Sequence, residues 1–258
     1  MDSANDAAAV RTADEADDVL HSMLFDGDEP APSAEVLKAR HCMVIRAADT
    51  EGHRSAAHVL VERRYADSGY TTAPSAGAQT PARFTLTAEV NDTVQGTLTI
   101  GFDGSGGLLV DQCFGDATAR LRDEGATLCE FIKFAVDSVA HSKRVLAALF
   151  HTAFIYAYVI RGCDRIVIEV NPRHVRFYAH MLGFEVLADE RINPRVNAPA
   201  VLMSIDLHYG AERIAMAHRE PGRRSERSMY RYFFSAEETR GIVRRLLAKD
   251  EPAPALAH

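Results

Sequence analysis

The sequence predicts a mixed α/β fold in which a central sheet is flanked by helices. Stretches with the alternating pattern of strands are interleaved with stretches of helical period along most of the 258 residues. Two of the strand patterns are joined by a short polar link, which indicates a β-hairpin. A further stretch is apolar on every face, as in a helix buried on all sides. Strands and helices in this order favour a mixed sheet with helices packed against it.

The first half of the chain is expected to form a strand, a helix, a long loop and a hairpin. The strand is CMVIRAA (42–48), and the helix spans about 53–66. Residues 67–82 are rich in Gly, Pro, Ser and Thr, and loops of this length are often lids or binding loops. The hairpin joins FTLTAEV (84–90) to VQGTLTIGF (94–102).

The second half alternates strands with helices. A helix is expected to begin after Pro172 and to end at Gly183, because proline is favoured at helix starts and glycine at helix ends. The expected elements are a strand at 127–131, a long apolar helix at 144–161, a buried strand at 165–171, the helix at 173–182, strands at 184–189 and 200–207, and one or two amphipathic helices within 225–249.

Charge divides the chain into segments, although the net charge is only −7. Residues 1–35 hold ten acidic residues and one basic residue and are poor in large apolar residues, so we expect this segment to be disordered. Residues 36–210 are expected to form the folded domain, residues 211–250 a basic helical extension, and residues 251–258 a tail. The basic extension either recruits an acidic partner or is a solvated helix face.

Composition bounds the location and the partners. The acidic N-terminus lacks a signal-peptide pattern, and the longest apolar stretch, 145–160, is too short for a membrane span of ~20 residues. No transmembrane segment is therefore expected, and no nucleic-acid partner is expected of this acidic chain. The four cysteines form no C-x-x-C pair, and the histidines show no metal-ligand spacing. These features favour a cytoplasmic protein without a metal site or disulfide framework.

Several stretches carry a resemblance to known families. IVIEVNPRHVRFYAHMLGFEVL resembles the last part of a GNAT acyltransferase core, with Asn171 followed seven residues later by Tyr178. TLCEFIKFAVD (127–137) resembles the E-x-x-R-F stretch of acyl-homoserine-lactone synthases, with Lys133 in place of Arg. LVERRYADSGY (60–70) and INPRVNAPAVLMSIDL (192–207) resemble segments of the N-acyl amino acid synthases of the FeeM type.

The resemblance implies a GNAT-like, mostly antiparallel sheet and an acyl transfer reaction. In such enzymes the tyrosine equivalent to Tyr178 can protonate the departing thiolate, although a tyrosine on an amphipathic helix is often only a packing residue. The similar stretches also make Asn171 and Asn197 substrate-binding candidates.

The acyl donor is expected to be acyl carrier protein rather than coenzyme A. GNAT enzymes that use acetyl-coenzyme A bind its pyrophosphate through a glycine-rich turn at a helix start. The corresponding segment here, SKRVLAALF (142–150), contains no glycine. The phosphopantetheine arm of a carrier protein has no pyrophosphate to hold, so it is the expected donor group, and no permanently bound cofactor is expected.

Glu130 is the candidate general base. It is a charged residue within an apolar strand, where partial removal from water raises the pKa of a carboxylate so that it can accept a proton from an amine. A salt bridge with Lys133 is the alternative role. A β-bulge would bring the two residues together and free backbone N–H groups for an oxyanion. Glu130, Lys133 and Tyr178 are thus the catalytic candidates.

The acceptor and the acyl chain need different surroundings. The carboxylate of an amino acid acceptor requires a cation, and Arg173 and Arg195 are the candidates because they lie next to strand ends. Surface solvation is the alternative, and the favoured one for either arginine taken singly. An acyl chain requires an apolar groove, which aromatic side chains could line. The alternative is that these side chains simply belong to the hydrophobic core. The aromatic candidates for this groove are Phe131, Phe134, Phe150, Phe154, Tyr156 and Tyr158.

The sequence therefore predicts an N-acyltransferase that joins a long-chain acyl group from acyl carrier protein to the amino group of an amino acid. The alternatives are a coenzyme A-dependent GNAT N-acetyltransferase and a GNAT-shaped binding module without catalysis.

Overall fold

A computed structural model of the protein describes residues 43–67, 83–137, 143–219 and 228–250. Seven strands form one sheet in the order β1-β2-β3-β4-β5-β7-β6. All neighbouring strands are antiparallel except β4 and β5, which are parallel. The strands are β1 (Met43–Ala47), β2 (Arg83–Val90), β3 (Thr93–Phe102), β4 (Leu128–Val136), β5 (Arg165–Val170), β6 (Glu185–Asn193) and β7 (Ala198–Asp206).

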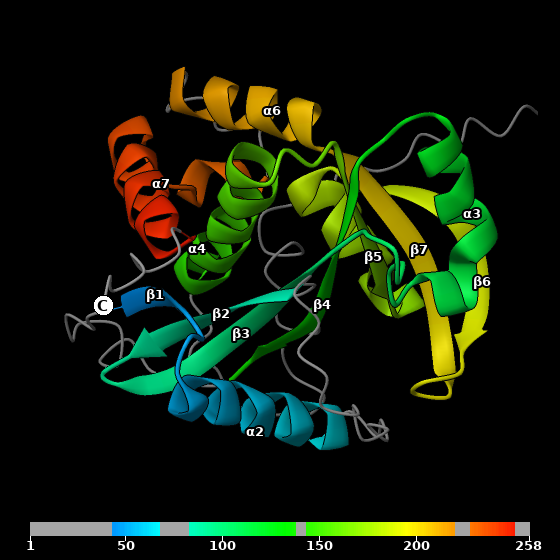
Figure 1. The fold of residues 1–258 in the computed structure, drawn as a ribbon, viewed down its shortest axis with the longest axis horizontal. Helices are drawn as coiled ribbons and strands as arrows, with labels where there is room; N and C mark the ends of the chain where they lie inside the picture. Colours follow the sequence, from blue (N-terminus) through cyan, green and yellow to red (C-terminus); the bar gives the residue numbers. More distant parts are fainter. Residues whose placement is uncertain (1–42, 68–82, 138–142, 220–227, 251–258) are drawn as a thin grey trace, which may run out of the picture.

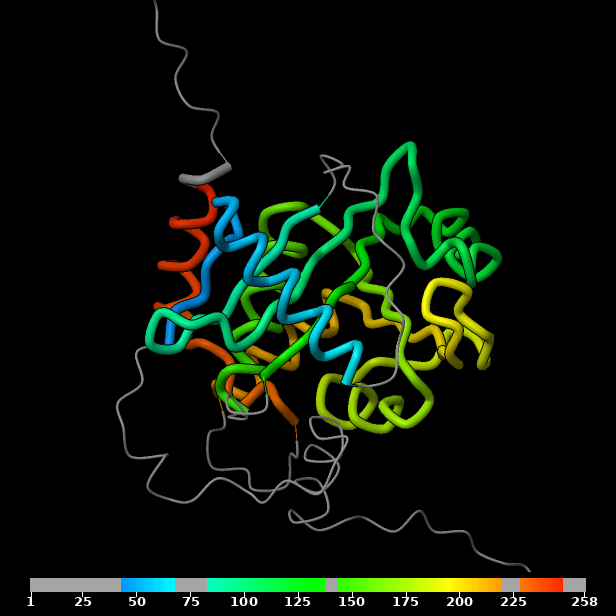
Figure 2. Tube along the Cα trace, turned by 90° about the horizontal axis from the view of Figure 1, so that it is seen from below, coloured from blue at the N-terminus to red at the C-terminus, as the bar shows by residue number. Residues whose placement is uncertain are grey.

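Helices cover both faces of this sheet (Figure 1). α2 and α3 lie on one face, and α4 with the C-terminal helices lies on the other. Viewed from below, α2 runs across the strands of the β1–β4 half (Figure 2). The longer helices are α2 (Glu51–Asp67), α3 (Asp111–Asp123), α4 (Lys143–Phe154), α6 (Leu207–Arg219) and α7 (Ala236–Asp250).

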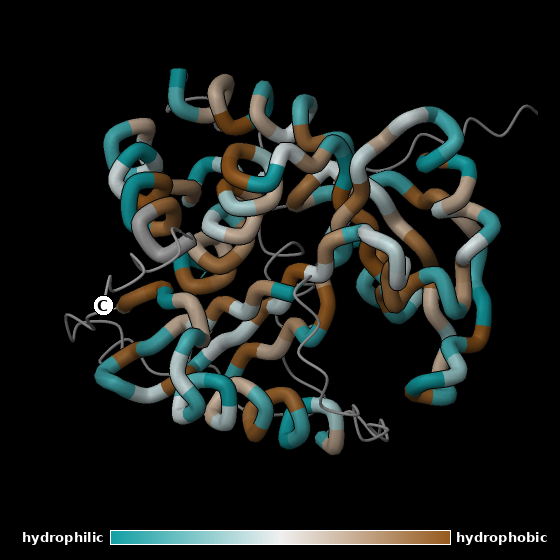
Figure 3. Tube along the Cα trace, in the orientation of Figure 1, coloured by the Kyte–Doolittle hydropathy of each residue, from teal (hydrophilic) through white to brown (hydrophobic). Residues whose placement is uncertain are grey.

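The core lies mainly between the sheet and α4 (Figure 3). Inward-facing residues of β2 and β3, such as Leu86, Leu98 and Ile100, are fully buried against Leu146 and Leu149 of α4. The continuous helical stretch Lys143–Ile160 has the length and hydropathy of a membrane span, but 67% of it is buried inside the fold. That burial is typical of a core helix.

The predicted strands, the hairpin, the helix expected at about 53–66 and the long apolar helix are confirmed, and the first of these helices is observed at Glu51–Asp67. The structure corrects the extent of three elements. β4 continues to Val136, and β6 continues to Asn193. The expected helix at 173–182 is a succession of a 3-10 turn, η4 (Pro172–His174), a short α-helical turn, α5 (Val175–Phe177), and a π-helical turn, η5 (Tyr178–Leu182).

One helix, α3, was not predicted, and another, α6, was predicted only in part, as the start of the helical extension expected at 211–250. α3 buries Phe114, Ala117, Thr118 and Leu121, which is a helical spacing, but its small and polar residues and its internal Gly115 conceal the pattern. α6 follows directly from β7 at Leu207, four residues before the expected extension, and Asp206 caps its start by accepting a hydrogen bond of 3.0 Å from the backbone N–H of Tyr209. The predicted loop at 67–82, apart from Asp67 in α2, and the acidic segment 1–35 lie outside the described residues.

His151 attaches the C-terminal region to the core. Its Nδ1 accepts a hydrogen bond of 2.9 Å from the backbone N–H of Phe234, and its ring stacks on Phe233 at 4.5 Å between centroids. Burial, with a smaller effect of His218, lowers the pKa of His151 to about 3. The ring is therefore neutral at pH 7, as an acceptor nitrogen must be.

Candidate active site

A cleft opens where the two parallel strands part. β4 and β5 pair only over Leu128–Glu130 and Arg165–Val167, although both strands continue beyond this point. The cleft has a volume of about 1390 Å³ and is lined by α2, by the middle strands and by the segments after β5 and β6. This exceeds the ~300–1000 Å³ of ordinary small-molecule pockets, so it can hold two substrates at once.

A β-bulge interrupts β4 within this cleft. Thr99 pairs with Ile132 and Thr97 with Ala135, so β4 has one residue more than β3 over this stretch. Lys133 takes up the extra length with a φ of 51°, which is uncommon for a residue other than glycine. The bulge turns backbone groups of β4 away from the β3 ladder, on a stretch of β4 that has no partner in β5.

Glu130 is held by the backbone rather than by Lys133. One carboxylate oxygen accepts from the N–H of Leu109 and the other from the N–H of Val110, each at 3.0 Å. Among the described residues, no ion pair or hydrogen bond joins Glu130 to Lys133. The side chain of Glu130 is 3% exposed, and burial raises its pKa despite the two backbone hydrogen bonds. Each oxygen keeps a second lone pair, so the carboxylate can still accept a proton.

Gly101 makes room for this carboxylate. Gly101 of β3 pairs directly with Glu130 of β4, and the Glu130 side chain lies over it. A Cβ on Gly101 would stand 2.7 Å from Oε1 of Glu130, which is closer than real Cβ contacts allow. Glu130 therefore depends on a glycine at this position of the neighbouring strand.

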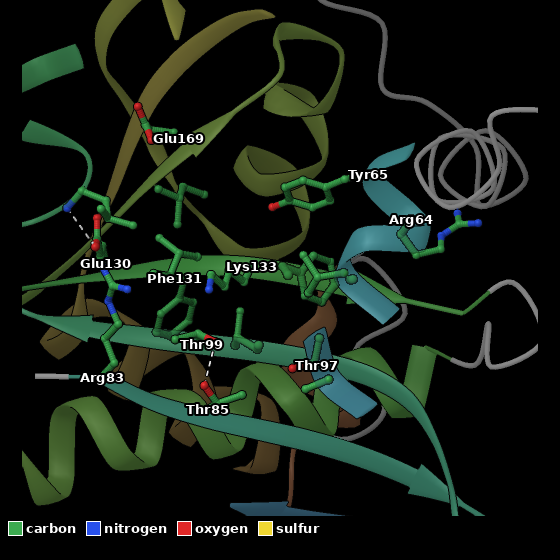
Figure 4. A pocket seen from close by; sticks show the side chains of 18 of the residues that line it. Arg64, Tyr65, Arg83, Thr85, Thr97, Thr99, Glu130, Phe131, Lys133 and Glu169 are labelled. Atoms are coloured by element: carbon green, nitrogen blue, oxygen red, sulfur yellow. Dashed lines mark hydrogen bonds between the residues drawn. The ribbon is translucent and has the colours of Figure 1, made fainter. Parts of the chain in front are cut away.

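A second carboxylate, Glu169 of β5, lies at the same end of the cleft (Figure 4). It forms an ion pair with Arg195 and accepts a hydrogen bond of 3.2 Å from Asn193. Burial is the main cause of its raised pKa. Arg195 also donates to the carbonyl oxygen of Leu109 at 2.6 Å, so it connects Glu169 to the segment that holds Glu130.

Glu169 was not among the residues predicted from the sequence, although its position carries a signal. Glu169 is the one acidic residue in the mostly apolar strand RIVIEV, just as Glu130 is the one acidic residue in β4. Arg195 was proposed as a free cation for a substrate carboxylate. In the structure its guanidinium is engaged by Glu169, by the Leu109 carbonyl and by Gln112.

Aromatic residues form the apolar wall of the cleft. Phe131, Phe134, Phe150 and Tyr178 line it, and Phe134 contacts Phe150 at 5.1 Å between centroids. Phe150 in turn packs edge-on against Tyr178. The other three aromatic candidates, Phe154, Tyr156 and Tyr158, lie outside the cleft.

Tyr178 is buried, and burial is the main cause that raises its pKa above the ordinary value of 10. Within the described part of the chain, its hydroxyl makes no hydrogen bond. A tyrosine with a raised pKa keeps its proton at neutral pH and is available as a hydrogen-bond donor. Tyr65 of α2 also lines the cleft, and its side chain points into it (Figure 4).

The remaining candidates divide between the cleft and the surface. Asn171 and Arg173 line the cleft, and the Asn171 side chain accepts from the backbone N–H of Arg173 at 3.2 Å. Asn197 lies outside the cleft in the turn between β6 and β7, where it is exposed with a φ of 48°. Asparagine tolerates this conformation, which accounts for the residue as a turn former and gives no support for a substrate contact.

The chain is similar to a family of known enzymes in both sequence and structure. The family model described as "N-acyl amino acid synthase FeeM" matches residues 56–206. The structure of FeeM, an N-acyl amino acid synthase from uncultured soil microbes, is 27% identical, with a TM-score of 0.63, and the match covers 68% of this chain and 95% of FeeM. Its likeness confirms the predicted sheet architecture.

Two further structures show lower similarity. The acyl-homoserine-lactone synthase LasI is 12% identical with a TM-score of 0.48, and the match covers 65% of this chain and 91% of LasI. An N-acetyltransferase from Staphylococcus aureus Mu50 is 13% identical with a TM-score of 0.45, and the match covers 64% of this chain and 98% of that one. No curated protein matches this chain significantly.

Proposed function

Because the chain belongs to the FeeM family of N-acyl amino acid synthases, and is thus an N-acyltransferase, we propose that it joins a long-chain acyl group from acyl carrier protein to the amino group of an amino acid. The observation that carries the proposal is a large cleft with an aromatic wall and two carboxylates, the buried Glu130 and the partly buried Glu169. The wall suits an acyl chain, and the carboxylates suit an amine.

The reaction requires an unprotonated amine. Glu130 takes the proton from the acceptor ammonium, directly or through a water molecule. The amine nitrogen then attacks the thioester carbonyl carbon, so that a C–N bond forms and the carbonyl oxygen becomes an oxyanion. When this intermediate collapses, the C–S bond breaks and the phosphopantetheine thiolate leaves, with the Tyr178 hydroxyl as its proton or hydrogen-bond donor. The nitrogen, which still carries one proton more than an amide, gives that proton up to water.

Backbone N–H groups of the bulge at Lys133 are the proposed oxyanion donors. Fixed donors at the position where charge develops usually contribute more to catalysis than any other single effect. They need no reorganisation, because the bulge is part of the strand. Lys133 itself, half-buried and with a pKa lowered by burial, adds positive charge to this part of the cleft.

Acyl carrier protein is the proposed donor because the segment 138–150 has no glycine with which to form a pyrophosphate turn. The nucleotide half of an acyl-coenzyme A would thus gain no such contacts. We expect a much higher kcat/KM for acyl carrier protein than for coenzyme A carrying the same acyl chain. Steady-state rates with matched donors measure this, and equal or better rates with coenzyme A would refute the donor assignment.

N-acyl amino acids extracted from cells that overproduce the protein test the function as a whole. We expect mass spectrometry to detect them in these cells and to find far less in cells that produce Glu130→Gln. Absence of such lipids in the presence of folded wild-type protein would overturn the proposed function. A cytoplasmic location is part of this proposal, and the free thiols of Cys113, Cys129 and Cys163 suit a reducing compartment.

The basic C-terminal region is a candidate docking surface for the acidic carrier protein. Arg223, Arg224 and Arg227 of this region lie outside the described residues, but Arg240, Arg244 and Arg245 of α7 are exposed. Charge reversal of the α7 arginines is expected to lower kcat/KM for the carrier-bound donor by about 10-fold at low salt, mainly through slower association. Added salt should shrink the difference, because it screens exposed charges.

A short acyl thioester that lacks the protein carrier separates docking from packing. The α7 variant should process this small donor at the wild-type rate. A matched reversal of Arg120, an exposed arginine of α3, should affect neither donor. Equal losses with both donors would mean that α7 only supports the core, and no loss with either would mean that its arginines are simply solvated.

A further inference from the structure

The floor of the cleft is a polar face of the sheet. Arg83 of β2 pairs with Gly101 of β3, which pairs with Glu130 of β4, so these three positions share one face. On the same face, Thr85 pairs with Thr99, and their hydroxyl oxygens are 2.9 Å apart. The opposite face of these strands is apolar and packs on α4. This polar floor marks the part of the cleft that fits a charged acceptor rather than an acyl chain.

Two cations on this floor lack a carboxylate partner. Arg83 and Lys133 both line the cleft, and within the described residues neither forms an ion pair or a side-chain hydrogen bond. Figure 4 shows the Arg83 side chain rising from β2 toward Glu130, with the Lys133 ammonium in the same part of the cleft. Each is half-buried, and the charge of Arg83 is one of the causes that lower the pKa of Lys133.

The charges at this end of the cleft do not balance. Arg195 is neutralised by its ion pair with Glu169. Of these side chains, Glu130 is then the one carboxylate that can balance the two positive charges of Arg83 and Lys133. Both of its oxygens already accept hydrogen bonds from backbone N–H groups. Counting these five described side chains alone, this end of the cleft carries one positive charge more than it carries negative charges. Two half-buried positive charges are unfavourable side by side unless an anion lies near them. One bound carboxylate would supply the negative charge that neutralises the excess.

We propose that Arg83 and Lys133 bind the carboxylate of the acceptor, an inference that rests on the proposed function. The planar guanidinium of Arg83 suits a two-pronged contact with a carboxylate, and Lys133 adds a point charge. A carboxylate held there leaves the α-amino group beside Glu130, which lies across Gly101 from Arg83. The site thus selects amines that carry a free carboxylate on the adjacent carbon, and it excludes their carboxamides.

Paired acceptors test this assignment. A tetradecanoyl-carrier protein is supplied with an equimolar mixture of the twenty L-amino acids, and the preferred acceptor is identified by mass spectrometry. Rates are then compared for that amino acid and for its carboxamide, which keeps the amine but lacks the carboxylate charge. For the wild-type enzyme, we expect a kcat/KM about 10- to 100-fold higher for the amino acid, which is the value of a charge-assisted contact.

Arg83→Gln should remove most of this preference. Its kcat/KM for the amino acid is expected to fall by about 10- to 100-fold, mainly through a higher KM, while the carboxamide is little affected. Arg83→Lys should restore part of the preference. Arg165→Gln, a strand arginine outside the cleft, is the matched control and should leave both acceptors unchanged. Thermal melting of each variant establishes that it is folded.

The outcomes separate the carboxylate site from the proposed function. If the wild type acylates none of the amino acids, the proposed function fails and this inference fails with it. If it acylates amino acids and carboxamides equally well, the function stands and the carboxylate site is overturned. If Arg83→Gln lowers kcat equally for both acceptors and shifts the pH profile, Arg83 only tunes Glu130, and the assignment is again overturned.

Discussion

Replacement of Glu130 by glutamine is expected to lower kcat by ~10²–10⁴-fold, the usual contribution of a general base. Glutamine preserves the size of the side chain but cannot accept the ammonium proton. The wild-type enzyme should lose activity as the pH falls through the pKa of Glu130, because the base must be ionised. Burial raises this pKa above 4.5, so the loss should begin at a higher pH than for an exposed glutamate. The pH dependence of kcat measures this limb.

The structure gives Glu130 a second role that the experiment must separate from the first. Its two oxygens hold Leu109 and Val110 at the start of α3, and in glutamine one of these acceptors becomes an NH₂ donor. Hydroxylamine distinguishes the roles, since it is already unprotonated at neutral pH and needs no base. If Glu130→Gln matches the wild type with hydroxylamine but not with the amino acid, Glu130 is the base. An equal loss with both, or a failure to fold, would mean that it is only an anchor.

Gly101→Ala is expected to lower kcat/KM by about 10²-fold, although the substitution adds only one methyl group. The new Cβ would occupy the space of the Glu130 carboxylate, which must then leave its position beside the Leu109 and Val110 N–H groups. A displacement of ~1 Å in a reacting group is sufficient for a loss of this size. Steady-state kinetics and a thermal melt measure the effect on activity and on stability.

Gly104 provides the matched control for this substitution. It lies in the segment that follows β3, and a Cβ added there meets nothing within 4 Å. Gly104→Ala should therefore keep wild-type activity and melting temperature. Full activity of Gly101→Ala would show that the carboxylate can move without harm, which would remove Glu130 from the mechanism.

Much of the fold could be predicted because its signals are local. The β2–β3 hairpin follows from two alternating stretches and a short polar link, and the buried helix at 143–160 follows from its uniform apolarity. The missed helix α3 lacked such signals, because small and polar residues stand at several of its buried positions. There, packing against the rest of the chain outweighs local propensity. The start of α6 was misplaced because the helix begins at Leu207, directly after a strand.

Part of the site was also predictable. Glu130 was identifiable as a charge in an apolar strand, and the resemblance to acyltransferases pointed to Asn171 and Tyr178, which line the cleft. Arg195 was a reasonable carboxylate ligand by its position after a strand. Its engagement by Glu169 depends on the packing of the turn after β6 against β5, which a linear pattern does not contain.

The sequence by itself determined the alternation of strands and helices, the family, and the presence of a buried acid in β4. Each of these is recorded in neighbouring residues. Only the tertiary structure decided that Arg83, Gly101 and Glu130 lie side by side, and that β4 and β5 part beyond Glu130 to open a cleft. These features depend on the register between strands distant in sequence. Register is set by the packing of whole faces and by the bulge at Lys133, so no single stretch of the chain specifies it.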